Sequence, residues 1–125
     1  MSSLKLAVPS EKPGGLDAAM SMHFGHCDLY TLVTIEDKNI TAVSTFENLA
    51  HVQGGCMAPV QHLAAGGVNA LLAGGMGMRP LMGFQQVGIE VYYAGGHVTV
   101  GQAVHAWLEG TLQPFSRDNT CKGGH

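Results

Sequence analysis

The sequence predicts a small α/β domain built on a mixed sheet. Apolar and β-branched runs alternate with helical segments in the second half of the chain, as in strands joined by helical crossovers. The first half carries two strand-like runs on either side of the turn Asp37-Lys38-Asn39, which indicates an antiparallel hairpin. A length of 125 residues with 46% hydrophobic residues suits one domain with one core.

The strands of the first half follow from apolar runs bounded by turn residues. Residues 4–8 (LKLAV) predict a short buried strand, closed by Pro9 and the Pro13-Gly14-Gly15 turn. Residues 29–36 (LYTLVTIE) predict a second strand, and the alternating residues 40–46 predict a third. We therefore expect these three strands to form an antiparallel meander.

The second half of the chain alternates helices and strands. The predicted elements are a helix over 57–65, a strand over 68–73, a helix over 79–87, a strand over 89–93 and a helix over 100–108. Pro59 and Pro80 suit first helical turns, where no N–H group is needed. Thr99 and Gly110 are the expected caps of the last helix. Residues 1–110 would form the domain, and residues 111–125, which lack periodicity, a flexible C-terminal tail.

Right-handed crossovers fix the expected sheet topology. They favour a five-stranded sheet of order 3-2-1-4-5, covered by about three helices. In that order the first, third, fourth and fifth strands end at the same edge of the sheet. Ligands of open α/β sheets bind outside such carboxyl ends, so we expect the binding site there.

The loops predicted at this edge carry soft and imidazole side chains. They are Met20, Met22, His23, His26 and Cys27 after the first strand, His51, Cys56 and Met57 after the third, Met76 and Met78 after the fourth, and His97 after the fifth. Thiolate, thioether and imidazole groups suit copper(I) and iron–sulfur centres rather than magnesium or calcium. The sequence therefore favours a metal or metal–sulfur cluster held by these loops.

The predicted metal ligands are His23, His26, Cys27, Cys56 and Cys121. An odd number of widely spaced cysteines without an export signal favours free thiols over a disulfide framework. Cys56 stands at a predicted helix start, where an inert buried thiol is one interpretation; a helix N-terminus also lowers a thiol pKa and favours thiolate, which is the other. By contrast, His62, His105 and Met82 lie within predicted helices, where ordinary packing or solvent exposure is the simpler interpretation.

Charge and motif content exclude other function classes. Six Lys and Arg residues form no cluster and the net charge is −3, which argues against nucleic-acid binding. No apolar run approaches the ~20 residues that cross a bilayer, and the N-terminus lacks a signal-peptide pattern, so a cytoplasmic location is expected. The chain has no GxSxG, Walker-type, HExxH or paired CxxC motif, so we do not expect an enzyme.

The Gly74-Gly75-Met76-Gly77 loop leaves an alternative open. A glycine loop that opens a helix can cradle an anion with its N–H groups, and Arg79 would add a charge-assisted contact. A small anion-binding or nucleotide-binding protein therefore remains possible. A single-metal copper chaperone using Cys, His and Met is the other alternative.

Three segments together resemble the dinitrogenase iron–molybdenum cofactor family. They are His23-Phe24-Gly25-His26 before a strand, Gly74-Gly75-Met76-Gly77-Met78-Arg79, and Gly88-Ile89-Glu90-Val91. The resemblance implies a ribonuclease-H-like fold without ribonuclease activity. It also implies a role in binding, carrying or assembling nitrogenase cofactor precursors; the related orange protein group holds molybdenum–copper–sulfide or iron–sulfur clusters.

By this resemblance, the cofactor would contact Phe24, Gly25, His51, Gly74, Gly75, Met76, Gly77, Met78 and Arg79. Two positions depart from the family: His26 stands where Arg is frequent, and Cys56 is an additional thiol. The sequence therefore predicts non-enzymatic carriage or assembly of an anionic Fe–S, Fe–Mo–S or Mo–Cu–S cluster. Cofactor-donor and cofactor-acceptor proteins would be the partners, with no nucleic acid and no membrane involved.

Overall fold

The computed structural model describes residues 3–21, 29–47, 61, 63–76, 78–94 and 98–115. At residues 46–47 and 78–80 the description covers the backbone alone. All structural statements below refer to these residues.

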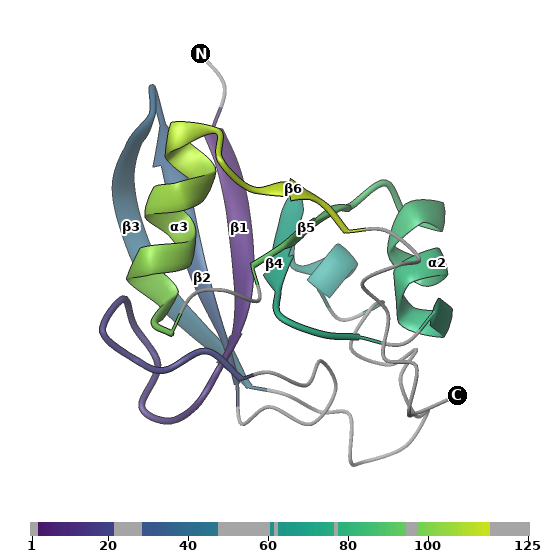
Figure 1. Ribbon diagram of the computed structural model, residues 1–125, viewed down its shortest axis with the longest axis horizontal. Helices are drawn as coiled ribbons and strands as arrows, with labels where there is room; N and C mark the ends of the chain where they lie inside the picture. The colour runs from purple at the N-terminus through teal and green to yellow at the C-terminus, as the bar shows by residue number, and fades with distance from the viewer. Residues whose placement is uncertain are drawn as a thin grey trace.

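The domain is built on one mixed β-sheet (Figure 1). Its strands are β1 (Ser3–Ser10), β2 (Leu29–Glu36), β3 (Asn39–Glu47), β4 (Ala70–Ala73), β5 (Glu90–Tyr93) and β6 (Gln113–Pro114). They are arranged in the order β3-β2-β1-β4-β5-β6. β1, β4 and β5 are parallel, while β2 is antiparallel to β1 and β3 is antiparallel to β2. The predicted α/β class and the order 3-2-1-4-5 are thus confirmed.

The sheet has a sixth strand that the sequence did not predict. Gln113 and Pro114 pair antiparallel with Tyr93 and Tyr92 at the end of β5. The next residue, Phe115, donates its N–H to the Val91 carbonyl at 2.8 Å and is buried. The sheet and the core therefore extend into the segment predicted as a tail. The sequence did not indicate this strand, because two residues are too few to show a periodicity.

The β2–β3 hairpin has the predicted tight turn. Asp37 and Lys38 have φ values of 51° and 67°, and Glu36 pairs with Asn39 across the turn. Two consecutive positive φ angles are characteristic of the type I′ turn, whose twist matches that of the flanking strands. A register shift follows, because Ile35 faces Ile40 whereas Thr34 faces Ala42.

The helices agree closely with the predicted ranges. α2 spans Met78–Gln86 and α3 spans Val100–Glu109, and residues 61 and 63–65 are helical within the predicted 57–65 helix. α3 begins at Thr99 with a capping box and ends at Gly110, which has the left-handed conformation, as predicted. Within the described ranges, no helix has the length and apolarity needed to cross a membrane.

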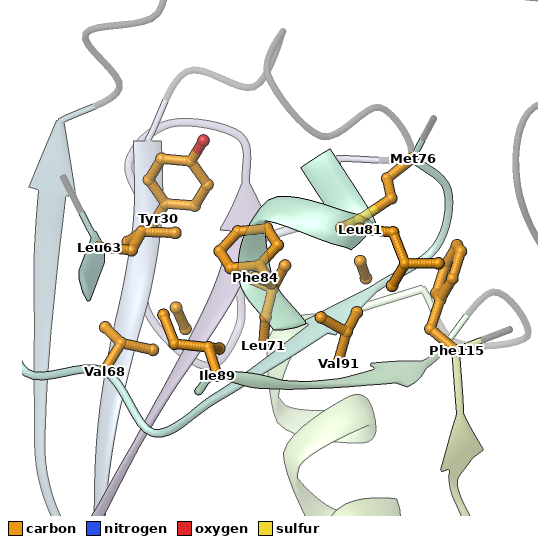
Figure 2. Packing of buried hydrophobic residues seen from close by; sticks show 12 residues of the cluster. Tyr30, Leu63, Val68, Leu71, Met76, Leu81, Phe84, Ile89, Val91 and Phe115 are labelled. Carbon is orange, nitrogen blue, oxygen red and sulfur yellow. The ribbon is translucent and has the colours of Figure 1, made fainter. Parts of the chain in front are cut away.

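Side chains alternate between the two faces of the sheet, so the protein has two cores. One face carries Leu6, Val8, Val33 and Leu72 against α3, which lies over β1 and β2 in Figure 1. The other face packs against α2 and the helical residues near Leu63. Its buried cluster contains Ala7, Tyr30, Leu63, Val68, Leu71, Ala73, Met76, Leu81, Phe84, Ile89, Val91 and Phe115 (Figure 2). The sheet is therefore the middle of three layers.

Candidate functional site

Four strands end at one edge of the sheet. β1, β3, β4 and β5 run in the same direction, and they end at Ser10, Glu47, Ala73 and Tyr93. Ala94, directly after β5, donates its N–H to the Ala73 carbonyl at 2.8 Å, which holds two of these ends together. Loops from distant parts of the sequence leave the sheet at this carboxyl edge. Since ligands of open α/β sheets bind outside the carboxyl ends of the strands, we expect a site formed by several of these loops here.

The loop that follows β1 folds back along this edge. Isolated bridges join Met20 to Ser10 and Ala19 to Thr99. Ser21 donates its N–H to the Pro9 carbonyl at 2.8 Å, and Met20 donates to the Val98 carbonyl at 2.9 Å. The loop therefore connects the end of β1 to the start of α3, and Ser21 lies at the carboxyl edge.

The N-terminus of α3 is already occupied by this loop. Val100 and Gly101 donate their N–H groups to the Ala18 and Leu16 carbonyls at 3.0 and 2.8 Å. A Cβ atom at Gly101 would lie 3.0 Å from the Leu16 carbonyl oxygen, so the close approach favours glycine. The Gln102 N–H bonds to the Thr99 side chain at 3.2 Å. These groups are therefore not available to an anionic ligand, although a helix N-terminus would otherwise attract one.

The glycine loop between β4 and α2 is the second element of the edge. Gly75 is buried and Gly74 is half-buried, and the first turn of α2 follows within a few residues. The positive end of the α2 dipole therefore lies at this edge. Met76 is 2% exposed and lies beside Leu81 and Phe115 in the buried cluster (Figure 2), so its side chain belongs to the core.

A buried polar network anchors the β1–β2 loop beside the edge. The Ser10 and Thr31 side chains are fully buried, and their hydroxyl oxygens are 2.9 Å apart. The Ser10 hydroxyl donates to the Val8 carbonyl at 2.6 Å, so the Thr31 hydroxyl must donate to Ser10. The Thr31 oxygen also accepts the Gly15 N–H at 3.1 Å. The Thr31 side chain of β2 thus forms hydrogen bonds with both β1 and the β1–β2 loop.

Replacing Thr31 with valine is expected to destabilise the protein by about 1–3 kcal/mol. Valine keeps the shape of threonine but leaves the Gly15 N–H without this acceptor and Ser10 without this donor. Urea unfolding measures the change, and amide exchange of Gly15 should accelerate. The matched control is Thr45→Val on exposed β3, which we expect to change stability by no more than about 0.5 kcal/mol. Equal losses in the two variants would contradict a specific role for the network.

Comparison with known proteins identifies the family of this chain. Residues 4–110 match the family model described as dinitrogenase iron-molybdenum cofactor. The chain belongs to this family. Its sequence is also 30% identical over 114 residues to the uncharacterized protein MJ0580 of Methanocaldococcus jannaschii, covering 90% of this chain and 92% of the relative.

Solved structures share the fold of this dinitrogenase iron–molybdenum cofactor family protein. The apo form of the orange protein from Desulfovibrio gigas superposes with a TM-score of 0.76 and 28% identity, covering 90% of this chain and 96% of that one. The structure of PH0822 gives a TM-score of 0.75 and 25% identity, covering 90% and 96%. These likenesses confirm the fold, and the family match indicates a cofactor-related role.

Most of the predicted metal ligands and cofactor contacts of this family member lie outside the described residues. They are His23, Phe24, Gly25, His26, Cys27, His51, Cys56, Gly77 and Cys121. Met78 and Arg79 are described by their backbone, in the first turn of α2. Of the predicted cofactor contacts, Gly74, Gly75 and Met76 have described surroundings, and all three belong to the β4–α2 loop.

The described residues nevertheless fix where the ligand-bearing segments attach. The segment with His23, His26 and Cys27 lies between Ser21 and Leu29, and Leu29 pairs with both Ser10 and Glu47. The segment with His51 and Cys56 begins after Glu47, at the same edge. The predicted convergence of these segments thus agrees with where the strands end, while the ligands themselves remain a prediction.

The described residues do not contain a metal site of their own. Among them, no three His, Cys, Asp or Glu side chains are grouped closely enough to hold a metal ion. His105 is exposed on α3 and lies 3.1 Å from the Glu109 carboxylate, one helical turn away. This geometry agrees with the interpretation of His105 as an ordinary surface residue.

Two open cavities lie away from the carboxyl edge. One, of about 340 Å³, is lined by Leu4, Ile35, Asp37, Lys38, Trp107 and Leu108 at the hairpin turn. The other, of about 330 Å³, is lined by Leu81, Gln85, Gly88, Ile89, Glu90, Val91, Tyr92, Pro114 and Phe115. Burial and a 2.9 Å hydrogen bond to Glu90 raise the pKa of the Tyr92 hydroxyl above its ordinary value, so it stays neutral at physiological pH. Among the described residues that line these two cavities, none is one of the predicted cofactor contacts Gly74, Gly75 and Met76.

The residues that position the edge were not predictable from side-chain patterns. Leu16, Ala18 and Ala19 act through their backbone groups, which any residue carries, so no side-chain pattern could reveal them. Gly14 is a weak sequence signal for this loop, because a glycine in the Pro13-Gly14-Gly15 turn suits a positive φ angle. It has φ +80°, and an added Cβ atom would lie 2.7 Å from the Thr45 side chain.

Proposed function

We propose that this protein binds an anionic metal–sulfur cluster as cargo at the carboxyl edge of its sheet, and carries it or assists its assembly without catalysing a reaction. One observation carries the proposal. Four strand ends meet at one edge, and the two segments richest in Cys and His attach there, in a chain that belongs to a cofactor-related family.

The outer metals of the cluster would be bound by soft side chains. His23, His26 and Cys27 belong to a segment whose two ends are held near Ser10, and Cys56 belongs to the segment that leaves β3. Thiolates and imidazoles are the usual protein ligands of iron–sulfur and copper–sulfur centres. Cys121 would add a fifth ligand from the C-terminal segment.

The glycine loop would offset the negative charge of the cluster. Backbone N–H groups of Gly74, Gly75 and Gly77, together with the α2 dipole and Arg79, provide positive potential in a protein whose net charge is −3. Phe24, Gly25, His51 and Met78 would complete the contacts. The side chain of Met76 is buried in the core and would anchor this loop to the domain.

The test is metal and acid-labile sulfide analysis of protein purified anaerobically from its native host, with a visible absorption spectrum. We expect several metal ions and sulfide per chain, with absorption from sulfide-to-metal charge transfer. The ratio of iron, molybdenum and copper would distinguish an Fe–S, an Fe–Mo–S and a Mo–Cu–S cargo.

A cytoplasmic location and transient donor and acceptor proteins complete the proposal.

Other results would contradict this function. One copper ion per chain without sulfide would instead indicate a copper chaperone. A metal-free protein that also resists cluster reconstitution, but binds a nucleotide in a way that Arg79→Ala abolishes, would instead indicate an anion site at the glycine loop.

A further inference from the structure

The outer edge of the sheet at β3 is a second surface of interest. β3 is the first strand in the sheet order, so only β2 pairs with it among the described residues. It is nine residues long, which is long for an edge strand. Residues 39–45 are all exposed. Their outward N–H and C=O groups form a row that an added strand can pair with.

This edge lacks most of the features that keep edge strands apart. From Asn39 to Phe46 the sequence is NITAVSTF, without a charged residue and without proline. Ile40 and Val43 are 39% and 41% exposed. Proteins usually protect such edges with lysine, proline or bulges. Here the irregularity lies at Thr41, opposite the Thr34–Ile35 step, and the register from Ala42 onward is regular.

We propose that a second copy of this chain pairs antiparallel with β3 over residues 42–46. An antiparallel pair of identical strands has two-fold symmetry, so each strand presents the same groups to the other. Because the strand carries no charge up to Phe46, the two copies bring no like charges into opposition. A charged partner strand would find no counter-charge on this edge. The absence of charge along residues 39–46 therefore favours pairing with a second, identical strand.

The dimer would leave the candidate cluster sites independent. Two antiparallel β3 strands place the carboxyl edges of the two sheets at opposite ends of the joined sheet. The proposal therefore does not rest on the proposed function, and either can fail without the other. Pairing over five residues is a small interface, so we expect a concentration-dependent dimer rather than a permanent one.

Sedimentation equilibrium of the full chain under reducing conditions tests the proposal. The weight-average mass of the wild type should rise with concentration from 13.1 kDa toward twice that value. Val43→Lys and Ala42→Lys, which add a charge to opposite faces of the strand, should each raise the dissociation constant about tenfold or more, because symmetry adds two ammonium groups to one interface.

The matched control is Val87→Lys, at an exposed valine after α2 that is 45% exposed. This variant should associate like the wild type, and thermal melts should show that all three variants fold. Amide exchange of the wild type should slow with concentration within residues 39–47. A wild type that stays monomeric, a Val87→Lys variant that weakens association equally, or concentration-dependent protection confined to α2 would each overturn the proposal.

Discussion

The Cys27→Ala/Cys56→Ala double variant is expected to lose most of its cluster after anaerobic reconstitution. The two thiolates belong to segments that attach at adjacent strand ends, since Leu29 pairs with Glu47. Removing both would leave the two imidazoles and the Cys121 thiolate as the proposed ligands of the outer metals, and soft metal–sulfur centres bind thiolate strongly. Metal and sulfide per chain, with the visible spectrum, measure the loss.

Histidine variants provide the control for this experiment. His23→Ala/His26→Ala should lower cluster content, whereas His105→Ala should not, because His105 is exposed on α3 beside Glu109. Unfolding curves of the cluster-free proteins should be similar, since loss of a ligand need not disturb the core. If the cysteine double variant retains full metal and sulfide, the thiol part of the proposed function is wrong.

The Phe84→Ala variant is expected to lower the free energy of unfolding by about 3–5 kcal/mol. Phe84 is fully buried in the core between the sheet and α2, and Figure 2 shows it in the middle of the cluster. Alanine would leave a cavity bordered by rigid elements, because α2 is tied to β5 through the Ile89 N–H and the Phe84 carbonyl at 2.9 Å. Denaturant unfolding measures the loss.

Met82→Ala is the matched control on the same helix. Its side chain is 51% exposed, so we expect a change of no more than about 0.5 kcal/mol. Phe84→Leu should fall between the two, because leucine refills part of the cavity. A small loss in Phe84→Ala would mean that α2 moves onto the sheet and fills the space, and the expectation of a cavity bordered by rigid elements would then be wrong.

Local sequence pattern predicted most of the secondary structure. The strand over 29–36 has the predicted bounds, and α3 starts and ends at the predicted caps, Thr99 and Gly110. β1 and β3 extend one or two residues beyond the predictions at each end, because strand pairing continues past the apolar run. β4 begins at Ala70 rather than residue 68. The Val68 N–H still bonds to the Leu63 carbonyl in the preceding turn, while Asn69 bonds to Lys5 through its backbone and its side chain and accepts the Glu90 N–H just before the named strand.

The candidate site was predictable in part. The order of the strands, and hence the shared carboxyl edge, followed from the alternation of elements and the right-handed crossover rule. The burial of Met76 did not follow from sequence, because a thioether suits both a metal and a core. Whether a given methionine faces a ligand or a core depends on neighbours far along the chain, here Phe115 among them.

The sequence by itself determined the α/β class, the topology, the caps of α3 and the soft ligands available to this protein. The caps and the ligands depend on residue type and local spacing, which act over one turn of helix or one strand, and the topology follows from the order of the elements and the right-handed crossover rule. Only the tertiary structure decided that Leu16 and Ala18 fill the N-terminus of α3, that Gln113 and Pro114 extend the sheet, and that β3 pairs on one side alone within the described part of the chain. Those outcomes depend on backbone groups meeting across long sequence separations, and backbone groups are the same in every residue except proline.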